Sequence, residues 1–187
     1  MSETLIFILR SVIDIYAFLL LIRLLLQLVQ ANFYNPICQT IFKVCAPVVE
    51  PLNRLLPTIG SFNLAALVAA ILVKWSFYLL MIGFGAGAPS EIFVYLAVAG
   101  FDLLRTLIEI YFWGIFILVI SSWVGATQHP TLALVSQVVD PYMRPFRNLI
   151  PPIGMIDISP MAAIFTLMFI RAKVLPMLGS LIMPFLS

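Results

Sequence analysis

Charged side chains are scarce in this chain, at 10% of 187 residues, whereas 63% of the residues are hydrophobic. A soluble domain of this length cannot enclose so much apolar side chain, so the composition excludes an ordinary soluble protein. The net charge is only +2, and the basic residues lie scattered among apolar ones. This pattern is unlike the basic surface of a nucleic-acid-binding protein. We therefore expect a chain that resides in a lipid bilayer and has no nucleic-acid partner.

Metal ligands and reactive groups are equally rare. Cys38 and Cys45, the two cysteines, have no second cysteine pair or histidine near them that would complete a zinc or redox motif. We interpret both as small apolar side chains on one helical face. The single histidine, His129, precedes a proline in a turn position and has no partner in the sequence. No catalytic triad or phosphate-binding loop is present, so we predict no enzyme, no metal and no cofactor.

The sequence has four long apolar stretches instead. Each is long enough for a helix to cross a hydrocarbon core of about 30 Å. Residues 92–100 are expected either to form a short helix of their own or to continue into the third span, and Pro176 is expected to kink the fourth. We predict an all-α integral membrane protein with four transmembrane helices. The predicted spans are residues 4–30, 64–83, 101–123 and 161–185.

The chain also repeats its own pattern about 94 residues apart. Residues 10–16, Arg-Ser-Val-Ile-Asp-Ile-Tyr, correspond to residues 105–111, Arg-Thr-Leu-Ile-Glu-Ile-Tyr. We infer a duplication, with residues 1–90 as the first unit and residues 91–187 as the second. Because each unit contains two spans, the units are expected to be parallel repeats with the same orientation. Later loop residues also correspond, namely Pro47, Pro51, Pro57 and Gly60 with Pro141, Pro145, Pro151 and Gly154.

A proline-rich amphipathic loop separates the two spans of each unit, at residues 36–57 and 130–151. We expect these loops to form helices that lie in the membrane interface. The first loop is predicted to form two short helices. In the second loop, Asp140 is predicted to cap a helix that begins at Pro141.

Turn and capping residues mark the corners that lead from each loop into the next span. In the first unit, Asn63 is expected to cap the second span. In the second unit, either Asp157 or Ser159 is expected to cap the last span, whose first turn tolerates a proline. The corner residues are Pro57, Gly60 and Asn63 in the first unit, and Pro151, Gly154, Asp157, Ser159 and Pro160 in the second.

Basic residues predict the orientation of the chain. They lie in the two long loops, whereas the termini and the central connection hold no exposed lysine or arginine. The positive-inside rule therefore predicts cytoplasmic loops and periplasmic termini. We expect Arg54, Arg144 and Arg147 to contact anionic lipid or to dock a cytoplasmic partner.

The second loop carries a family pattern. Residues 140–160 read Asp-Pro-x-x-Arg-Pro-x-Arg-x-x-x-Pro-x-x-Gly-x-x-Asp-x-Ser-Pro and follow Ser122-Trp123. This resembles the YggT family of bacterial integral membrane proteins, in the two-unit form typical of proteobacterial members. The first unit departs from the pattern, with Ala46 at the position that corresponds to Asp140. The resemblance implies a multi-pass protein of the bacterial inner membrane, linked either to osmotic stress and potassium homeostasis or to an assembly role like that of plastid relatives.

Charged side chains within the spans require an explanation, because each costs roughly 2.5–3.5 kcal/mol near the centre of a membrane helix. One interpretation is that two i,i+4 ion pairs make insertion tolerable. These pairs are Arg10 with Asp14 and Arg105 with Glu109.

The other interpretation is that the two units bring those four charges together with Lys74 and Arg171, as a polar path or an ion site. Arg23 and Lys173 are expected to snorkel to an interface instead.

Two hypotheses for function follow. The first is a role in ion homeostasis or transport, with carboxylates as the coordinating groups and with pores between protomers of a homo-oligomer, because four spans are few for an independent pathway. The second is a non-transporting scaffold that organises cytoplasmic or membrane protein partners through its loops.

Overall fold

The computed structural model describes residues 3–85, 88–125, 129–151 and 157–182. Nearly all of this part of the chain is helical. A two-stranded hairpin pairs Thr58 with Asn63 and Ile59 with Phe62. The elements are α1 (Glu3–Leu28), α2 (Pro36–Asn53), β1 (Thr58–Ile59), β2 (Phe62–Asn63), α3 (Leu64–Gly83), η1 (Pro89–Glu91), α4 (Ile92–Val124), α5 (Pro130–Leu149), α6 (Ser159–Phe169), η2 (Ile170–Val174) and α7 (Leu175–Ile182).

Four helical stretches among the described residues are long and apolar enough to cross a membrane. They are α1, α3, η1 with α4, and α6 through α7, so the prediction of an all-α protein with four spans is confirmed. The third runs unbroken from Ile92 to Val124, which shows that residues 92–100 continue into this span. At 1.5 Å per residue α4 is about 50 Å long, so it must tilt or project beyond a hydrocarbon core of about 30 Å.

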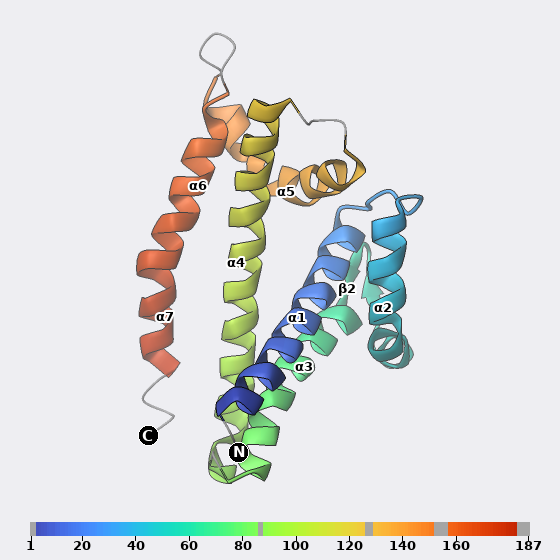
Figure 1. Ribbon diagram of the computed structural model, residues 1–187, viewed down its shortest axis with the longest axis vertical. Helices are drawn as coiled ribbons and strands as arrows, with labels where there is room; N and C mark the ends of the chain where they lie inside the picture. The colour runs from blue at the N-terminus through green and yellow to red at the C-terminus, as the bar shows by residue number, and fades with distance from the viewer. Residues whose placement is uncertain (1–2, 86–87, 126–128, 152–156, 183–187) are drawn as a thin grey trace.

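The spans lie in the order α1, α3, α4, α6 (Figure 1). Helix α3 packs on α1 of its own repeat and on α4 of the other, while α6 and α7 pack on α4. The start of α1, the end of α3 and the end of α7 lie at the same end of the molecule (Figure 1). This arrangement follows from two spans per repeat, because each pair of spans returns the chain to the side where it began.

The first repeat has a core built from small residues on α3. Ala65, Ala66, Ala69 and Ala70 are fully buried, and small side chains allow membrane helices to approach closely. From α2, Cys38 and Cys45 enter the same core as free thiols, which agrees with their interpretation as apolar side chains. Burial raises the pKa of both thiols, so they are poor nucleophiles at neutral pH.

The first loop forms one helix, so the prediction of two short helices is wrong. Helix α2 contains both Pro47 and Pro51. Each proline removes a backbone donor, but both lie on the exposed face, where the carbonyl that loses its partner stays accessible. Pro141 and Pro145 are accommodated in the same way, on the exposed face of α5.

The second loop helix begins eleven residues earlier than predicted, at Pro130 instead of Pro141. Its N-cap is His129, whose Nδ1 accepts a hydrogen bond from the Thr131 N–H at 3.2 Å. Asp140 and Pro141 therefore lie inside α5, and the predicted capping role of Asp140 is wrong. The amphipathic pattern of residues 130–139 favours the longer helix, because Leu134, Val138 and Val139 are buried on one face.

The predicted cap of α3 is confirmed, whereas the N-cap of α6 is Ile158 rather than Asp157 or Ser159. The Asn63 carboxamide oxygen accepts from the Ala66 N–H at 2.8 Å at the start of α3. At the start of α6, Asp157 accepts from the Ser159 N–H at 2.9 Å, and Pro160 occupies the first turn.

Two further sequence predictions concern local backbone geometry. Gly60 turns the hairpin with φ of +62°, a conformation that favours glycine. Its counterpart Gly154 lies outside the described residues. Pro176 follows a five-residue π-helical segment, η2, which widens the helix where the proline ring would otherwise crowd the preceding turn.

Gly114 provides a test of the packing between α4 and α5. A Cβ atom added at Gly114 would lie 2.7 Å from Val139 Cγ2, whereas one added at Gly100 on the same helix meets nothing within 4 Å. Gly100→Ala should raise the thermal stability of detergent-solubilised protein, because alanine favours a helix by about 1 kcal/mol over glycine. Gly114→Ala should lower it, because overpacking costs about 1–3 kcal/mol. Equal gains for both variants would contradict this packing.

Candidate functional site

Charged side chains from mid-span meet in the first repeat. Asp14 lies about 16 Å along α1, and Lys74 lies near the middle of α3. The buried Lys74 ammonium donates to Asp14 Oδ1 at 2.6 Å. Arg10 Nε lies 3.8 Å from Asp14 Oδ2, which confirms the predicted i,i+4 pair. The carboxylate thus ties α1 to α3 at the depth where a lone charge is most costly.

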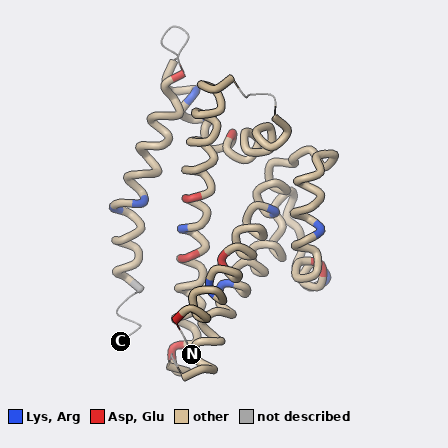
Figure 2. The backbone as a smooth tube through the Cα atoms, viewed as in Figure 1, with Lys and Arg blue, Asp and Glu red and all other residues tan. Residues whose placement is uncertain are grey.

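The second repeat contains a corresponding pair. Arg171 Nε lies 2.9 Å from Glu109 Oε1, and the guanidinium carbon lies 4.6 Å from the centre of the Phe112 ring. Glu109 is near the middle of α4, and Arg171 is near the middle of the last span. Each repeat therefore joins an acid on its first span to a base on its second, and Figure 2 shows these charges on the middle of the helices.

Two predictions about these charges are wrong. Among the described residues, no salt bridge joins Arg105 to Glu109; the Arg105 guanidinium lies over the Phe101 ring at 4.8 Å. The six charges also do not converge between the repeats. Asp14 pairs with Arg10 and Lys74 in the first repeat, and Glu109 pairs with Arg171 in the second. Glu109 pairs with Arg171 on the neighbouring span and not with Arg105 on its own helix, because the packing of α6 on α4 brings Arg171 within hydrogen-bonding distance.

A polar contact that is not evident from residue spacing links the repeats. The Tyr78 hydroxyl on α3 donates to Asp102 Oδ2 on α4 at 2.8 Å. Nearby, Trp75 Nε1 donates to the Ile92 carbonyl at 3.0 Å, and the Tyr78 ring stacks on Tyr95 with centroids 5.4 Å apart. Neither Tyr78 nor Asp102 belongs to a repeated motif, so only the packing of α3 on α4 reveals the link.

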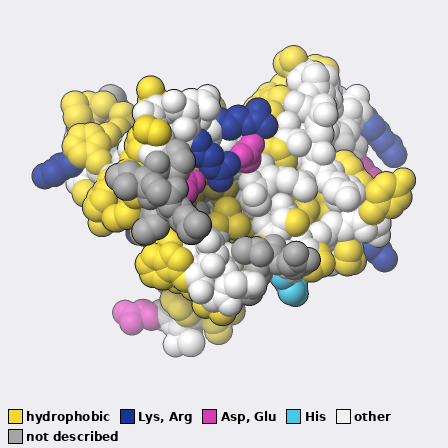
Figure 3. Space-filling model, turned by 90° about the horizontal axis from the view of Figure 1, so that it is seen from above, with side chains coloured by type: hydrophobic (Ala, Val, Ile, Leu, Met, Phe, Trp, Pro, Cys, Tyr) yellow, Lys and Arg dark blue, Asp and Glu magenta, His cyan; other side chains and the backbone are white. Residues whose placement is uncertain are grey.

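The acidic and basic residues of the loop motif form a surface network. Asp140 accepts hydrogen bonds from Arg144 Nε at 2.7 Å and from Arg147 Nη1 at 2.8 Å. Arg147 Nε also lies 4.0 Å from Asp157. Hydrogen bonds from Ser159 and the charge of Arg147 lower the pKa of Asp157. Viewed from above, acidic and basic side chains lie side by side on this face (Figure 3).

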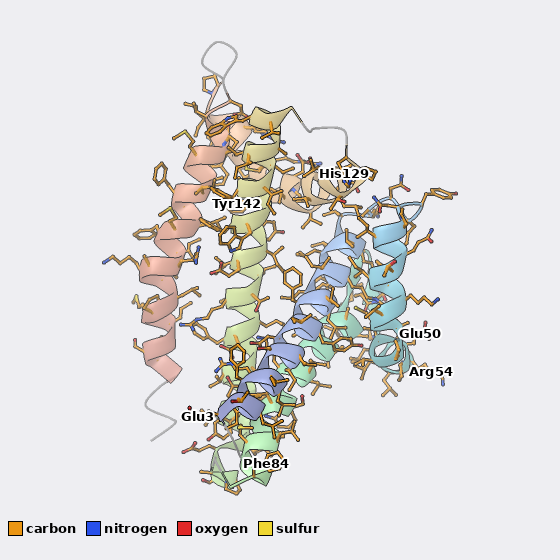
Figure 4. The ribbon with its side chains drawn as sticks, in the orientation of Figure 1. Glu3, Glu50, Arg54, Phe84, His129 and Tyr142 are labelled. Atoms are coloured by element: carbon orange, nitrogen blue, oxygen red, sulfur yellow. The ribbon has the colours of Figure 1, made fainter. Side chains whose placement is uncertain are left out.

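The first loop lacks this network. Glu50 and Arg54 project outward from the lower end of α2, and neither forms a salt bridge within the described residues (Figure 4). Tyr142, by contrast, points inward, and its hydroxyl donates to the Ala163 carbonyl at 3.1 Å.

Arg23 is placed differently from the prediction. It is only 6% exposed, and its Nη1 donates to the Phe42 carbonyl at 3.2 Å, so the snorkelling interpretation is wrong for this residue. Lys173 is exposed, as a snorkelling side chain requires. Helix α2 covers Arg23 because it packs along the last turns of α1, which a span-by-span interpretation of the sequence does not reveal.

An apolar groove of about 440 Å³ separates the repeats beside the second ion pair. Leu19 and Ile22 of α1 face Ile110 and Val138 of the second repeat across it, and Glu109 is its one charged residue among those described. No group of three or more potential metal ligands occurs within the described residues.

Taken together, the apolar spans, the amphipathic loop helices and the paired charges define a multi-pass α-helical membrane protein built from two repeats. The chain belongs to the CCB3/YggT family, whose model matches residues 2–83 and again residues 97–178. The two matches correspond to the two repeats inferred from the sequence.

Several relatives match over nearly their full length. "Uncharacterized protein YggT" of Escherichia coli (strain K12) is 33% identical over 186 residues, covering 97% of this chain and 96% of that protein. "Uncharacterized protein PA0392" of Pseudomonas aeruginosa is 34% identical over 181 residues, covering 94% and 90%. An "Uncharacterized protein" of Haemophilus influenzae is 29% identical over 181 residues, covering 97% and 96%. No solved structure matches the chain.

The ion pair of the first repeat predicts non-additive stability effects. Lys74→Met should destabilise the solubilised protein by about 2 kcal/mol, because it leaves the Asp14 carboxylate without its closest donor. Asp14→Asn combined with Lys74→Met should cost less than the sum of the two single changes. Denaturation of the four proteins of this double-mutant cycle measures the coupling, with Lys173→Met as the exposed control. Additive effects would mean that the pair carries no coupling.

Proposed function

We propose that this protein serves ion homeostasis at the bacterial inner membrane, with potassium as the first ion to test, through a polar path that forms between copies of the chain. Its long loops would face the cytoplasm and its termini the periplasm. The observation that carries the proposal is the exposure of the mid-span acids, at 44% for the Asp14 side chain and 40% for that of Glu109.

Half-exposed charges at this depth are unfavourable in lipid. Even a paired carboxylate and ammonium lose hydration that hydrocarbon does not replace, so these faces favour contact with water or with protein. A second copy of the chain would supply both, because an interface between copies shields the charges from lipid and can enclose a hydrated path. Four spans per chain are few for an independent pore, which also favours pores between protomers.

The carboxylates would be the coordinating groups in such a path. Asp14 and Glu109 are each held by a basic side chain from the neighbouring span. A cation that approached either acid would have to displace Lys74 or Arg171, so these two residues would act as gates. The corresponding placement in both repeats supports one function for the two pairs.

Ion flux into proteoliposomes tests the proposal. The purified chain should carry potassium above the leak of empty liposomes, and sodium flux measured in parallel gives the selectivity. The Asp14→Asn/Glu109→Gln double variant should lose most of this flux, because neutral amides coordinate cations more weakly than carboxylates. Glu3→Gln/Glu50→Gln, which removes two acids outside the mid-span sites, is the matched control and should retain the flux.

The same variants can be tested in cells. A deletion strain under salt stress should be complemented by the wild type and by the control variant, but not by Asp14→Asn/Glu109→Gln. Absence of flux from the reconstituted wild type, together with full complementation by the double variant, would refute a transport role.

A scaffold function is the second candidate, and the exposed network of Asp140, Arg144 and Arg147 favours it. A groove of about 470 Å³ adjoins this network, lined by the end of α1 and by Gln137 and Pro141 of α5. Because the groove lies where the two repeats meet, a partner segment seated there would contact both. Arginine side chains suit an acidic partner segment or anionic lipid headgroups.

Replacement of both arginines tests the scaffold function. Arg144→Ala/Arg147→Ala should reduce crosslinking to partner proteins in native membranes. Lys43→Ala/Lys173→Ala, which removes two exposed cations elsewhere, should not. Flotation with liposomes that contain or lack phosphatidylglycerol separates a lipid contact from a protein contact. Unchanged crosslinking and unchanged complementation in the arginine variant would eliminate the docking role.

A further inference from the structure

A polar cavity of about 510 Å³ lies in the first repeat, apart from the mid-span ion pairs. It is open to the surface and is lined by the end of α1, the connection that follows it, α2 and the β1–β2 hairpin. Most of its lining residues carry amide, hydroxyl or guanidinium groups, in a chain that is otherwise strongly apolar. The lining consists of Arg23, Gln27, Gln30, Phe33, Phe42, Asn53, Thr58, Ser61 and Asn63.

Among the described lining residues Arg23 alone is charged, and its charge is incompletely compensated. Its Nη1 donates to the Phe42 carbonyl, and its guanidinium carbon lies 4.9 Å from the Phe42 ring centre. Its buried Nε has no hydrogen-bond partner among the described residues. No described carboxylate lies within 4.0 Å of the guanidinium, and exposed Glu50 contributes only a longer-range attraction. A buried cation in this state favours an anionic partner.

The remaining lining groups suit the same partner. Gln27 lies one turn after Arg23 on the same face of α1, and Gln30 lies in the turn that follows this helix. Thr58 and Ser61 add hydroxyl groups from the hairpin. Amide and hydroxyl donors around one guanidinium are the groups that bind phosphate oxygens, and the planar guanidinium can bind two of them at once.

The second repeat contains the corresponding cavity, of about 390 Å³, and shows what the first one lacks. There the aligned position of Arg23 is Leu118, and the cation is Arg147, which already has Asp140 and Asp157 as partners. In the first repeat the positions of those two acids hold Ala46 and Asn63. The cavity of the second repeat therefore contains a cation with acidic partners from the chain, whereas the cavity of the first repeat contains a cation without them.

We infer that the cavity at Arg23 binds a phosphate-bearing anion, either a free phosphate or the headgroup of a phospholipid. Arg23 lies about 7.5 Å from the end of α1, a depth that lipid headgroups and dissolved anions both reach. The site is distinct from the mid-span pairs and does not depend on the proposed ion path.

Binding to the purified full chain in a neutral detergent tests this site. Inorganic phosphate, at constant ionic strength against chloride, probes the free anion. Phosphatidylglycerol in mixed micelles, compared with diacylglycerol, probes the headgroup. A saturable rise in melting temperature with phosphate identifies a free-anion site, and a rise only with phosphatidylglycerol identifies a headgroup site. Absence of saturable binding to either would overturn the inference.

Two variants assign the binding to this cavity. Arg23→Met removes the cation. Asn63→Asp supplies the acid that the second repeat has at this position. Because aspartate also caps helices, Asn63→Asp should fold even if Arg23→Met does not. Each should weaken binding roughly tenfold or more. Arg23→Met removes the charge-assisted hydrogen bonds to the anion, and the new carboxylate in Asn63→Asp competes with the anion for Arg23. Lys43→Met, which removes an exposed cation of the same repeat, should change binding less than about twofold. Wild-type affinity in Asn63→Asp would overturn the assignment.

Discussion

A charge in the middle of a membrane span must be neutralised nearby, and this requirement fixes how the helices of each repeat face one another. Asp14 reaches Lys74 only if α1 and α3 present these faces to each other, and Glu109 reaches Arg171 only if α4 and the last span do the same. The buried alanines of α3 then allow the close approach that a 2.6 Å contact requires. Apolar packing alone would permit several rotations of these helices, because the spans are apolar on all sides.

The length and apolar content of each stretch were enough to predict the four spans, and self-similarity was enough to predict the two repeats. Both features depend on consecutive residues and not on contacts between distant helices. The cap at Asn63 was predictable for the same reason, since a cap involves residues only two or three positions apart. Partners on other helices were not predictable: Arg171 displaces Arg105 at Glu109, and α2 covers Arg23. Those outcomes depend on helix rotation and on the path of the loop helices, which residue spacing does not specify.

The two repeats share a backbone plan but differ in how their loop charges are balanced. In the second repeat Asp140, Arg144 and Arg147 form a closed network on α5, joined to the start of α6 through Asp157. In the first repeat the acids of that network are absent, and a different cation, Arg23, is buried below the loop. After a duplication, one repeat can keep its cation compensated by its own acids while the cation of the other repeat binds an external group. The two repeats therefore differ in what can balance the cation: acids of the chain itself in the second repeat, and the proposed anionic ligand in the first.

The contacts between the repeats differ in kind from those within them. Within each repeat an ion pair at mid-span resists separation of the helices, since parting it would leave charges uncompensated at low dielectric. Between the repeats, the polar links among the described residues are hydrogen bonds. Two join α3 to α4, from Tyr78 to Asp102 and from Trp75 to the Ile92 carbonyl. Two more join the loops, from the Asn35 carboxamide to the Pro130 carbonyl at 3.1 Å and from the Asn32 N–H to the Gln137 side chain at 3.4 Å. The apolar groove beside Glu109 runs along this boundary. The boundary is nonetheless packed, since α3 lies along α4 and one buried apolar core joins residues of both repeats. A rigid-body shift of one repeat against the other would have to break that packing, but it would move Glu109 relative to α1 while leaving both ion pairs intact.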